Sequence, residues 1–211
     1  MTADPRSLRS TAIAAAIRDR RLIAVLRRIA PRERLLAFVG ELIADGVRIF
    51  EITFDADNAA ADLAAVKAHA GEDAWVGAGT IRTIDQLQAA VDAGASFGVS
   101  PVLDPAVLEA ALDAGLAFVP GAYSPTEIDA AWRAGATFVK LFPGSSLGPS
   151  HIRELGGPLP EVETIVTGGV DATNAAAFLA AGASAVGIGS ALGRMTSADR
   201  RALVRLIASA R

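Results

Sequence analysis

One lysine lies inside an apolar run, where its amine could do chemistry. The chain has only two lysines, Lys67 and Lys140, against eighteen arginines, and Lys140 lies within Phe138-Val139-Lys140-Leu141-Phe142. If this run is a strand, alternation places Phe138, Lys140 and Phe142 on one face. An apolar interior disfavours the ammonium form, and a neutral lysine amine attacks carbonyl carbons to form a Schiff base. The alternative is a strand-end lysine whose ammonium extends into solvent.

A carboxylate lies in a second apolar run, Ile49-Phe50-Glu51-Ile52-Thr53-Phe54. Alternation places Glu51 and Thr53 on the face opposite the apolar side chains of this run. A buried carboxylate is costly unless it is paired or used in chemistry. Beside an imine-forming amine, Glu51 would move protons during carbinolamine formation and dehydration, and then act on a substrate hydroxyl during C–C cleavage. The alternative is a structural ion pair of Glu51 with Lys140 or Arg27.

An arginine follows the first apolar run of the chain, Leu22 to Leu26. By alternation Arg27 shares a face with Ile23 and Val25, and it lies at the C-terminal end of the run. The guanidinium fork binds a carboxylate bidentately, which the lysine ammonium reproduces poorly. We therefore expect Arg27 to hold a carboxylate of the ligand.

Three further strand ends carry weaker signals. Thr80 ends Val76-Gly77-Ala78-Gly79-Thr80, where small residues leave room for a ligand beside its hydroxyl. Ser100-Pro101 ends the next run. Phe142 is interpreted either as a core aromatic or as a ring that stacks on a bound planar enamine.

Two glycine-rich strand ends predict an anion site. Thr167-Gly168-Gly169 and Gly187-Ile188-Gly189-Ser190 end the last two apolar runs, where many barrels hold phosphate on backbone amides. Glycine permits the close approach and the dihedral angles that such a site needs. Ser145, in the preceding loop, adds a hydroxyl. The alternative is plain loop geometry without a ligand.

The elements that would position these residues form a repeating pattern. Short apolar runs recur at intervals of about 20 to 28 residues: Leu22 to Leu26, Val47 to Phe54, Trp75 to Gly79, Phe97 to Val99, Ala117 to Val119, Phe138 to Phe142, Val162 to Thr167 and Ser184 to Ile188. Ala- and Leu-rich helical stretches separate them, and several end in a glycine suited to a left-handed helix end: Gly46, Gly94, Gly115, Gly135 and Gly182.

This pattern predicts an α/β fold, a compact (β/α)8 TIM barrel with an extra N-terminal helix, as a single domain over residues 1–211. Chemistry in such a barrel gathers at the C-terminal ends of the strands, where the residues above lie. An open doubly wound sheet is the alternative, but no Gly-x-Gly-x-x-Gly fingerprint follows the first strand. The uncharged segment 172–193 is long enough to span a bilayer, yet its polar and glycine residues divide it into a helix, a turn and a buried strand.

Composition excludes several classes of function. The 211 residues are 52% apolar and 20% charged, with a net charge of −3, so nothing supplies the positive field that nucleic acid requires. The chain has no cysteine and two isolated histidines, so we expect no metal site and no cofactor. We expect a cytoplasmic protein that acts on a small-molecule substrate, with no nucleic-acid or membrane partner.

Together these residues resemble one known family, the 2-keto-3-deoxy-6-phosphogluconate and 2-keto-3-deoxy-6-phosphogalactonate aldolases. The resemblance runs from about Leu22 to about Leu192, with its motifs in the same order and spacing: Ala24-Val25-Leu26-Arg27, Phe50-Glu51-Ile52-Thr53, Val76-Gly77-Ala78-Gly79-Thr80, Val99-Ser100-Pro101, Val119-Pro120-Gly121, Val139-Lys140-Leu141-Phe142-Pro143, Thr167-Gly168-Gly169 and Gly189-Ser190.

The resemblance implies a class I (Schiff-base) aldolase that cleaves a 2-keto-3-deoxy-6-phospho sugar acid to pyruvate and glyceraldehyde 3-phosphate. It implies that Lys140 forms the Schiff base with the pyruvyl carbonyl and that Glu51 is the acid/base. It further implies a metal-free homotrimer that binds a keto acid and a phosphorylated aldehyde. The candidate substrate-binding residues are Arg27, Thr53, Thr80, Pro101, Phe142 and Thr167, and the candidate phosphate-binding residues are Gly168, Gly169, Gly189, Ser190 and Ser145.

One departure leaves the substrate epimer open. Many gluconate-type members read Glu-x-Thr-x-Arg on the second strand, whereas Asp55 stands here at the position of that arginine. Galactonate-type members supply an arginine from the first strand, as Arg27 does here, while Thr167 is more similar to the gluconate type. Asp55 is interpreted as the start of a loop that caps the next helix near Asp57-Asn58. Another phosphate-binding barrel synthase or isomerase, and a non-catalytic sugar-phosphate sensor, are the competing functions.

Overall fold

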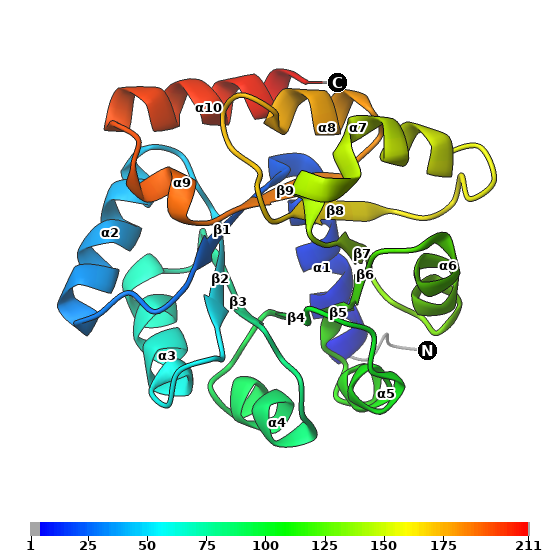
Figure 1. The fold of residues 1–211 in the computed structure, drawn as a ribbon. Coiled ribbons are helices and arrows are strands. Elements are labelled where there is room, and N and C mark those ends of the chain that lie inside the picture. Colours follow the sequence, from blue (N-terminus) through cyan, green and yellow to red (C-terminus); the bar gives the residue numbers. More distant parts are fainter. Residues whose placement is uncertain (1–4, 211) are drawn as a thin grey trace.

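Parallel strands and helices alternate along the chain and close into a barrel (Figure 1). The structure, a computed structural model, describes residues 5–210, so residues 1–4 and 211 of the predicted domain lie outside the described residues. The strands are β1 (Leu22–Leu26), β2 (Ile49–Thr53), β3 (Trp75–Gly79), β4 (Phe97–Val99), β5 (Ala117–Val119), β6 (Gly121–Ala122), β7 (Val139–Leu141), β8 (Thr164–Thr167) and β9 (Ala185–Ile188).

The helices surround the strands, apart from the first, which precedes the barrel. They are α1 (Pro5–Arg20), α2 (Arg32–Ala44), α3 (Ala59–Ala70), α4 (Ile84–Asp92), α5 (Pro105–Asp113), α6 (Pro125–Arg133), α7 (Gly144–Leu155), α8 (Ala175–Ala180), α9 (Ser190–Gly193) and α10 (Ser197–Ser209).

The sheet closes because one strand position is shared by two short strands. The strand order is β5-β4-β3-β2-β1-β9-β8-β7-β6, with every pair parallel, and β5 and β6 are separated only by Pro120. Proline has no backbone N–H to donate to a ladder, so the strand is interrupted there. Because β5 pairs with β4 and β6 pairs with β7, the two halves together form one barrel strand. The eight predicted strand runs and the compact barrel are therefore confirmed.

Glycines end the helices as the sequence predicts. All five predicted helix-ending glycines have positive φ, from 67° at Gly115 to 115° at Gly182. At Gly46, for example, the backbone N–H donates to the carbonyl of Ile43 at 3.0 Å and so satisfies a carbonyl at the helix end. A residue with a Cβ is strained in this conformation, which is why glycine occupies the turn before β2, β4, β5, β7 and β9.

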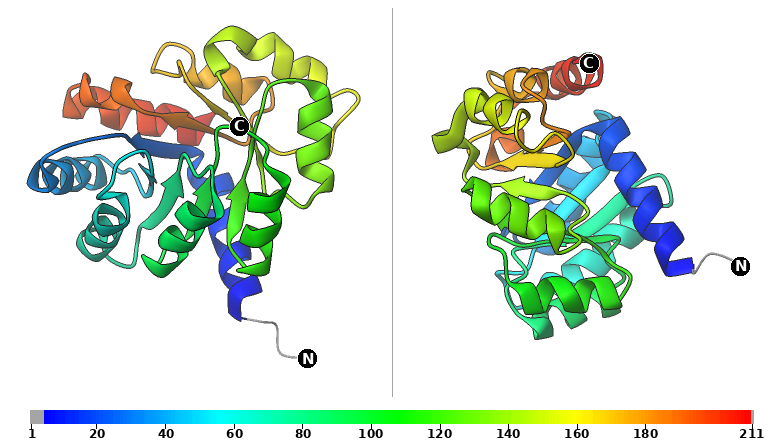
Figure 2. Two further views of the ribbon diagram at one scale, coloured as in Figure 1. Left: turned by 60° about the horizontal axis from the view of Figure 1, so that its bottom comes forward. Right: turned by 90° about the vertical axis from the view of Figure 1, so that its right-hand side faces the viewer.

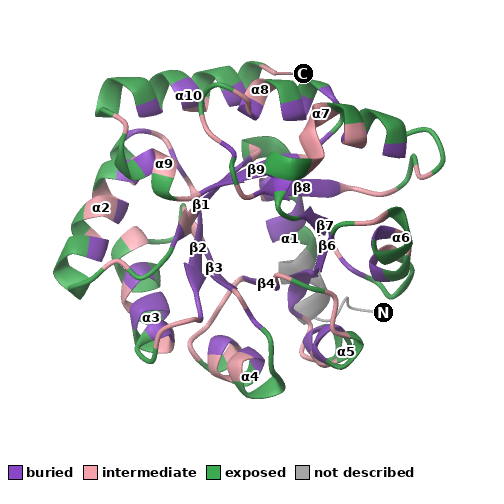
Figure 3. Ribbon diagram, in the orientation of Figure 1, coloured by how far each residue is buried: buried purple, intermediate pink, exposed green. Residues whose placement is uncertain are grey.

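Two separate apolar cores hold the fold together. Residues on the outer faces of the strands, such as Phe50, Ile52 and Val139, pack under the helices in the larger core. The smaller core fills the inside of the barrel with side chains that include Ile23, Ile49, Phe97, Phe138 and Ile165. Buried residues accordingly follow the strands in Figure 3, while the outer helix faces are exposed. The predicted alternation of these strands is confirmed.

Helix α1 closes the N-terminal end of the barrel. Ile13, Ala14 and Ile17 of this helix belong to the interior core, at 0%, 5% and 1% exposure. Figure 2 (right) shows α1 lying along the end of the barrel that faces away from the viewer in Figure 1. The extra N-terminal helix that the sequence predicts therefore acts as a plug, and only the C-terminal end of the barrel is left open.

A buried ion-pair network joins the last helix to α2. Arg200 of α10 is 5% exposed, and its Nε donates to Oδ2 of Asp45 at 2.5 Å while its Nη2 donates to Oε2 of Glu41 at 2.9 Å. Burial raises the pKa of Asp45, but hydrogen bonds from Ser197 and Arg200 outweigh burial and hold it below its usual value. The network fixes α10 against the part of α2 that lines the barrel mouth.

The uncharged segment 172–193 is folded into α8, β9 and α9, in agreement with the predicted division into helix, turn and strand. Within residues 5–210, no helix combines the length and apolar character that a membrane crossing would require.

We expect Ile17→Ala to lower the free energy of unfolding by about 2–5 kcal/mol, because it removes a buried side chain from the plug and leaves a cavity. Urea denaturation measures the change. Arg20→Ala on the exposed side of the same helix is the control and should change stability by less than about 0.5 kcal/mol. Equal effects of the two substitutions would show that α1 does not support the interior core.

Candidate active site

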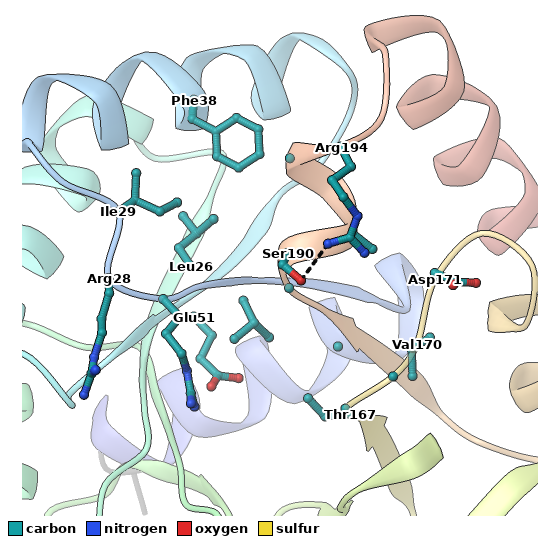
Figure 4. Close-up of a pocket in the computed structure, with 18 of the residues that line it drawn as sticks. Leu26, Arg28, Ile29, Phe38, Glu51, Thr167, Val170, Asp171, Ser190 and Arg194 are labelled. Atoms are coloured by element: carbon teal, nitrogen blue, oxygen red, sulfur yellow. Dashed lines mark hydrogen bonds between the residues drawn. The ribbon is translucent and has the colours of Figure 1, made fainter. Parts of the chain in front are cut away.

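A cavity of about 850 Å³ opens at the C-terminal ends of the strands. It brings together residues of β1, β2, β7, β8 and β9 and of the segments that follow them, and Figure 4 shows part of this lining, with Glu51, Thr167 and Ser190 around one space. The predicted site residues among its lining are Arg27, Glu51, Lys140, Phe142, Thr167, Gly168, Gly169, Gly189 and Ser190.

Lys140 lies in the barrel interior at the floor of this cavity. Lys140 is 5% exposed. The neighbouring Val139 and Leu141 face the helices and belong to the larger core. Strand β7 holds Lys140 in register with Gly121 on one side and Ile165 on the other. The Lys140 Nζ is 5.1 Å from the centre of the Phe142 ring, and in residues 5–210 it has no carboxylate within 4.0 Å. An amine so placed is available to attack a carbonyl carbon in the cavity.

Glu51 is the buried carboxylate of the same interior. It is 2% exposed, and its Oε1 is buried without a hydrogen-bond partner among the described residues. Within that part of the chain it forms no ion pair with Lys140 or Arg27, so the alternative of a structural ion pair is wrong. A Cβ on Gly79 would stand 2.0 Å from Oε1, which explains why glycine occupies this position of β3. A buried carboxylate without a partner is costly, and it is therefore a candidate for chemistry.

Arg27 stands at the end of β1 beside Thr80. Its Nη2 donates to Oγ1 of Thr80 at 3.1 Å. The Thr80 residue does not line the cavity itself, but it touches the arginine that does. The two residues expected to hold a carboxylate are thus in contact, with the guanidinium exposed toward the cavity.

Asp55 does not cap the next helix. The N-terminal residue that precedes α3 is Asn58, and its side chain makes no capping hydrogen bond. Asp55 instead forms ion pairs with two arginines. Its Oδ2 lies 3.1 Å from Nε of Arg28 and 3.8 Å from Nε of Arg27. The interpretation of Asp55 as a capping residue is therefore wrong, because its Oδ2 pairs with the two arginines that follow the neighbouring strand β1.

Phe142 lines the cavity and is 37% exposed, so it is not a core aromatic. Its ring lies against Gly168, where an added Cβ would be 3.0 Å from the ring carbon Cε2. The ring is held beside the Lys140 amine, where a planar imine or enamine would form.

The glycine-rich loops after β8 and β9 also line the cavity. Gly168 and Gly169 both have positive φ, at 88° and 77°, and this conformation turns successive backbone groups toward one side. The backbone N–H of Ser145 donates to the carbonyl of Gly168 at 2.9 Å, so the loops after β7 and β8 are joined. Asn174 strengthens the same loop by donating from Nδ2 to the carbonyl of Gly169 at 2.9 Å.

Ser190 begins the short helix α9 directly after β9, and an arginine one turn later accompanies it. The Arg194 Nη1 donates to Oγ of Ser190 at 3.1 Å (Figure 4). Asp171 stands at the same rim, where bonds from Thr173 hold the pKa of its carboxyl below the usual value. Loops after the last two strands and a short extra helix are the elements on which many barrels bind phosphate.

The cavity is basic although the chain carries a net charge of −3. Its lining contains Lys140 and five arginines against three carboxylates. Sequence patterns did not predict Arg28, Arg34, Phe38, Glu41, Asp171, Arg194 and Arg200 as lining residues. For Arg194 the sequence offers one signal, because it follows Ser190 by four residues, the spacing at which two side chains meet on a helix. In residues 5–210 no group of three or more histidines and carboxylates is placed to hold a metal ion.

Three further candidates lie near the cavity without lining it. Thr53 is buried, and its hydroxyl donates to the Leu26 carbonyl at 3.5 Å. The Pro101 carbonyl packs so closely on Gly121 that a Cβ there would be 2.2 Å away. Ser145 is exposed at the start of α7 and packs on Gly169. Thr53 and Ser145 therefore contact lining residues, whereas Pro101 contacts Gly121, which does not line the cavity.

Fold and site together define a (β/α)8-barrel enzyme with one interior lysine. The family model of the KDPG and KHG aldolases matches residues 13–207. The chain therefore belongs to the KDPG and KHG aldolase family.

Relatives of both epimer types are similar to the chain. It is 36% identical over 195 residues to the probable 2-dehydro-3-deoxy-6-phosphogalactonate aldolase of Rhizobium meliloti, covering 90% of this chain and 92% of that one. It is 39% identical over 140 residues to the 2-dehydro-3-deoxy-phosphogluconate aldolase of Treponema pallidum, covering 66% of each chain. Among solved structures, the KDPG aldolase of Legionella pneumophila, with pyruvate captured as a covalent carbinolamine, has a TM-score of 0.78 at 25% identity over 93% of this chain and 96% of that one.

Proposed function

We propose that this protein is a class I aldolase that cleaves a 2-keto-3-deoxy-6-phospho sugar acid to pyruvate and glyceraldehyde 3-phosphate. The observation that carries the proposal is the pair of buried groups inside the barrel, the Lys140 amine and the Glu51 carboxylate, both free of ion pairs within residues 5–210 and both facing one cavity. Family membership favours this chemistry over another barrel synthase or isomerase and over a sensor.

The chemistry follows from these two groups. The Lys140 amine adds to the keto carbon, and a proton passes from its nitrogen to the former carbonyl oxygen. Glu51, in its protonated form, then delivers a proton to this hydroxyl, so that water leaves and a protonated imine forms. Glu51, now a carboxylate, takes the proton from the C4 hydroxyl while the C3–C4 bond breaks. The electron pair of that bond moves into the imine to give an enamine, and the aldehyde leaves. Proton return to the enamine carbon and hydrolysis then release pyruvate.

Two anionic ends of the substrate match the two basic sides of the cavity. We assign the keto-acid carboxylate to Arg27 with Thr80, and the phosphate to the backbone of Gly168, Gly169 and Gly189 with Ser190. Arg194 donates to Ser190 and adds positive charge at the phosphate side. Thr53, Pro101, Ser145 and Thr167 support these two subsites. The relatives include gluconate and galactonate types, so the proposal names the substrate class without its C4 epimer.

Pyruvate with borohydride should add a reduced pyruvyl group to Lys140, because hydride reduces the imine to a stable secondary amine. Peptide mass mapping locates the label. Lys67 is the internal control: its Nζ is exposed and donates to the Gly94 carbonyl at 2.6 Å, so it should stay unlabelled. Label on Lys67 alone, or none on folded protein, would contradict the mechanism, and either competing function predicts no label.

Glu51→Gln should slow cleavage by roughly a hundredfold or more, the scale expected for a positioned general acid/base, while the near-isosteric amide keeps the fold. Steady-state release of pyruvate measures the rate. Glu109→Gln, at an exposed position of α5, is the matched control and should retain the wild-type rate. Near wild-type turnover of Glu51→Gln would show that Glu51 is only structural.

We further infer a cytoplasmic homotrimer. Large apolar side chains are exposed in the segments that follow three neighbouring barrel strands: Ile84 at 53%, Val102 at 53% and Tyr123 at 47%. Exposed apolar side chains that gather on one side of a molecule mark an interaction surface.

Light scattering should therefore give three times the mass of a single chain. Val102→Glu should lower the measured mass, because it would bury a charge at the proposed subunit interface. Leu206→Glu is the control, since Leu206 is 43% exposed on α10, away from these loops. A wild-type protein that is monomeric at micromolar concentration would refute the trimer.

A further inference from the structure

One acidic residue joins the two arginines at the end of β1. Asp55 follows β2, and its carboxylate has a side-chain exposure of 17% between Arg27 and Arg28. Arg28 is bound twice, since its Nε is 3.1 Å from Oδ2 of Asp55 and its Nη2 donates to the Asp55 carbonyl at 3.0 Å. Both guanidinium groups belong to residues that line the cavity, so Asp55 acts on the cavity from behind them.

The contacts of Arg27 leave part of its fork free for a ligand. Its Nε faces Oδ2 of Asp55 at 3.8 Å, and its Nη2 donates to Oγ1 of Thr80 at 3.1 Å. The hydrogen bond to Thr80 holds one end of the guanidinium, and the ion-pair contact with Asp55 favours an orientation with Nε toward this carboxylate. The remaining N–H groups at the end of the fork can donate to a carboxylate in the cavity.

The backbone around these residues is also held in an uncommon conformation. Arg28 has φ of 50° and Thr80 has φ of 60°, the left-handed region that side chains with a Cβ rarely adopt. Such strain persists only where surrounding contacts hold it. The hydrogen bond and the ion pair from Arg28 to Asp55 are contacts of this kind.

The Asp55 carboxylate is charged at neutral pH. Burial raises its pKa, but the Thr53 hydroxyl and the positive charges of Arg27 and Arg28 outweigh burial and hold the pKa below its usual value. A negative charge so close to Arg27 also weakens the field that a ligand carboxylate experiences. Orientation of the fork must therefore be the benefit that this residue provides.

We propose that Asp55 is a positioning residue that orients Arg27 and Arg28 for recognition of the keto-acid carboxylate. The inference deepens the proposed function, because it concerns the carboxylate subsite of the same cavity. Asp55 acts through the arginines and not by contact with the ligand. Its effect is therefore expected on the binding of the substrate carboxylate and not on the binding of the keto carbonyl.

The test compares pyruvate with pyruvamide, which keeps the ketone and replaces the carboxylate by a neutral amide. Borohydride trapping on Lys140 is measured against ligand concentration in wild-type protein, Asp55→Asn, Asp55→Glu and Asp57→Asn. Asp57 is an exposed acid of the same loop, and it makes no ion pair in the described part of the chain, so it is the matched control. Thermal unfolding shows whether each variant is folded.

For Asp55→Asn we expect the half-saturating pyruvate concentration to rise about tenfold, with trapping at saturation changed by less than about twofold. Pyruvamide trapping should not change, Asp57→Asn should match wild type, and Asp55→Glu should recover part of the pyruvate affinity. In an Arg27→Lys background, Asp55→Asn should raise the half-saturating pyruvate concentration less than it does in the wild-type protein, because one of the two arginines through which Asp55 acts is gone.

An unchanged pyruvate affinity in folded Asp55→Asn, or an equal loss for pyruvate and pyruvamide, would overturn the positioning role while leaving the aldolase proposal intact. A wild-type protein that traps neither compound on Lys140 would instead refute the proposed function, and the inference with it.

Discussion

The barrel interior is packed with apolar side chains only up to the level of Lys140 and Glu51, and this limit determines where chemistry takes place. A parallel barrel of eight strands has an interior that side chains must fill. Here the plug helix and residues such as Phe97, Phe138 and Ile165 fill its N-terminal half. Above them, the two ionisable groups are buried and line the cavity, and the cost of their desolvation is explained by a functional role.

Glycines on neighbouring strands make the room for the larger interior side chains. A Cβ on Gly77 would stand 2.5 Å from the Phe97 ring, one on Gly79 would stand 2.0 Å from Glu51, and one on Gly187 would stand 2.7 Å from the Thr167 hydroxyl. Each large side chain thus occupies space that its neighbouring strand leaves empty. Because of these close contacts, replacing any of the three glycines by alanine should lower the stability of the fold, although the backbone at these positions has an ordinary strand conformation.

Sequence alone predicted the strands, their inward faces and the lysine, because a period of two and helix-ending glycines are local signals. It did not predict the partners of Arg27 and Asp55, since a cross-strand ion pair depends on how two loops leave the barrel. Arg28 was missed for the same reason: its left-handed conformation lies beyond the strand, where alternation no longer holds. Pro120 also divides one predicted strand into two, because a missing N–H interrupts the ladder without changing the barrel.

The positions of the cations impose a direction on any bound substrate. Arg27 and Arg28 follow β1, whereas Ser190 and Arg194 follow β9, and Lys140 comes from β7, two strands beyond β9 in the sheet. In the proposed binding mode, a ligand with an anion at each end is held by both ends, and its reactive carbon faces the Lys140 amine. Reversing it would place the carboxylate on loops of backbone amides and the phosphate on an arginine pair already bound to Asp55. Because that acid repels a doubly charged phosphate more than a carboxylate, charge at the barrel mouth disfavours the reversed orientation.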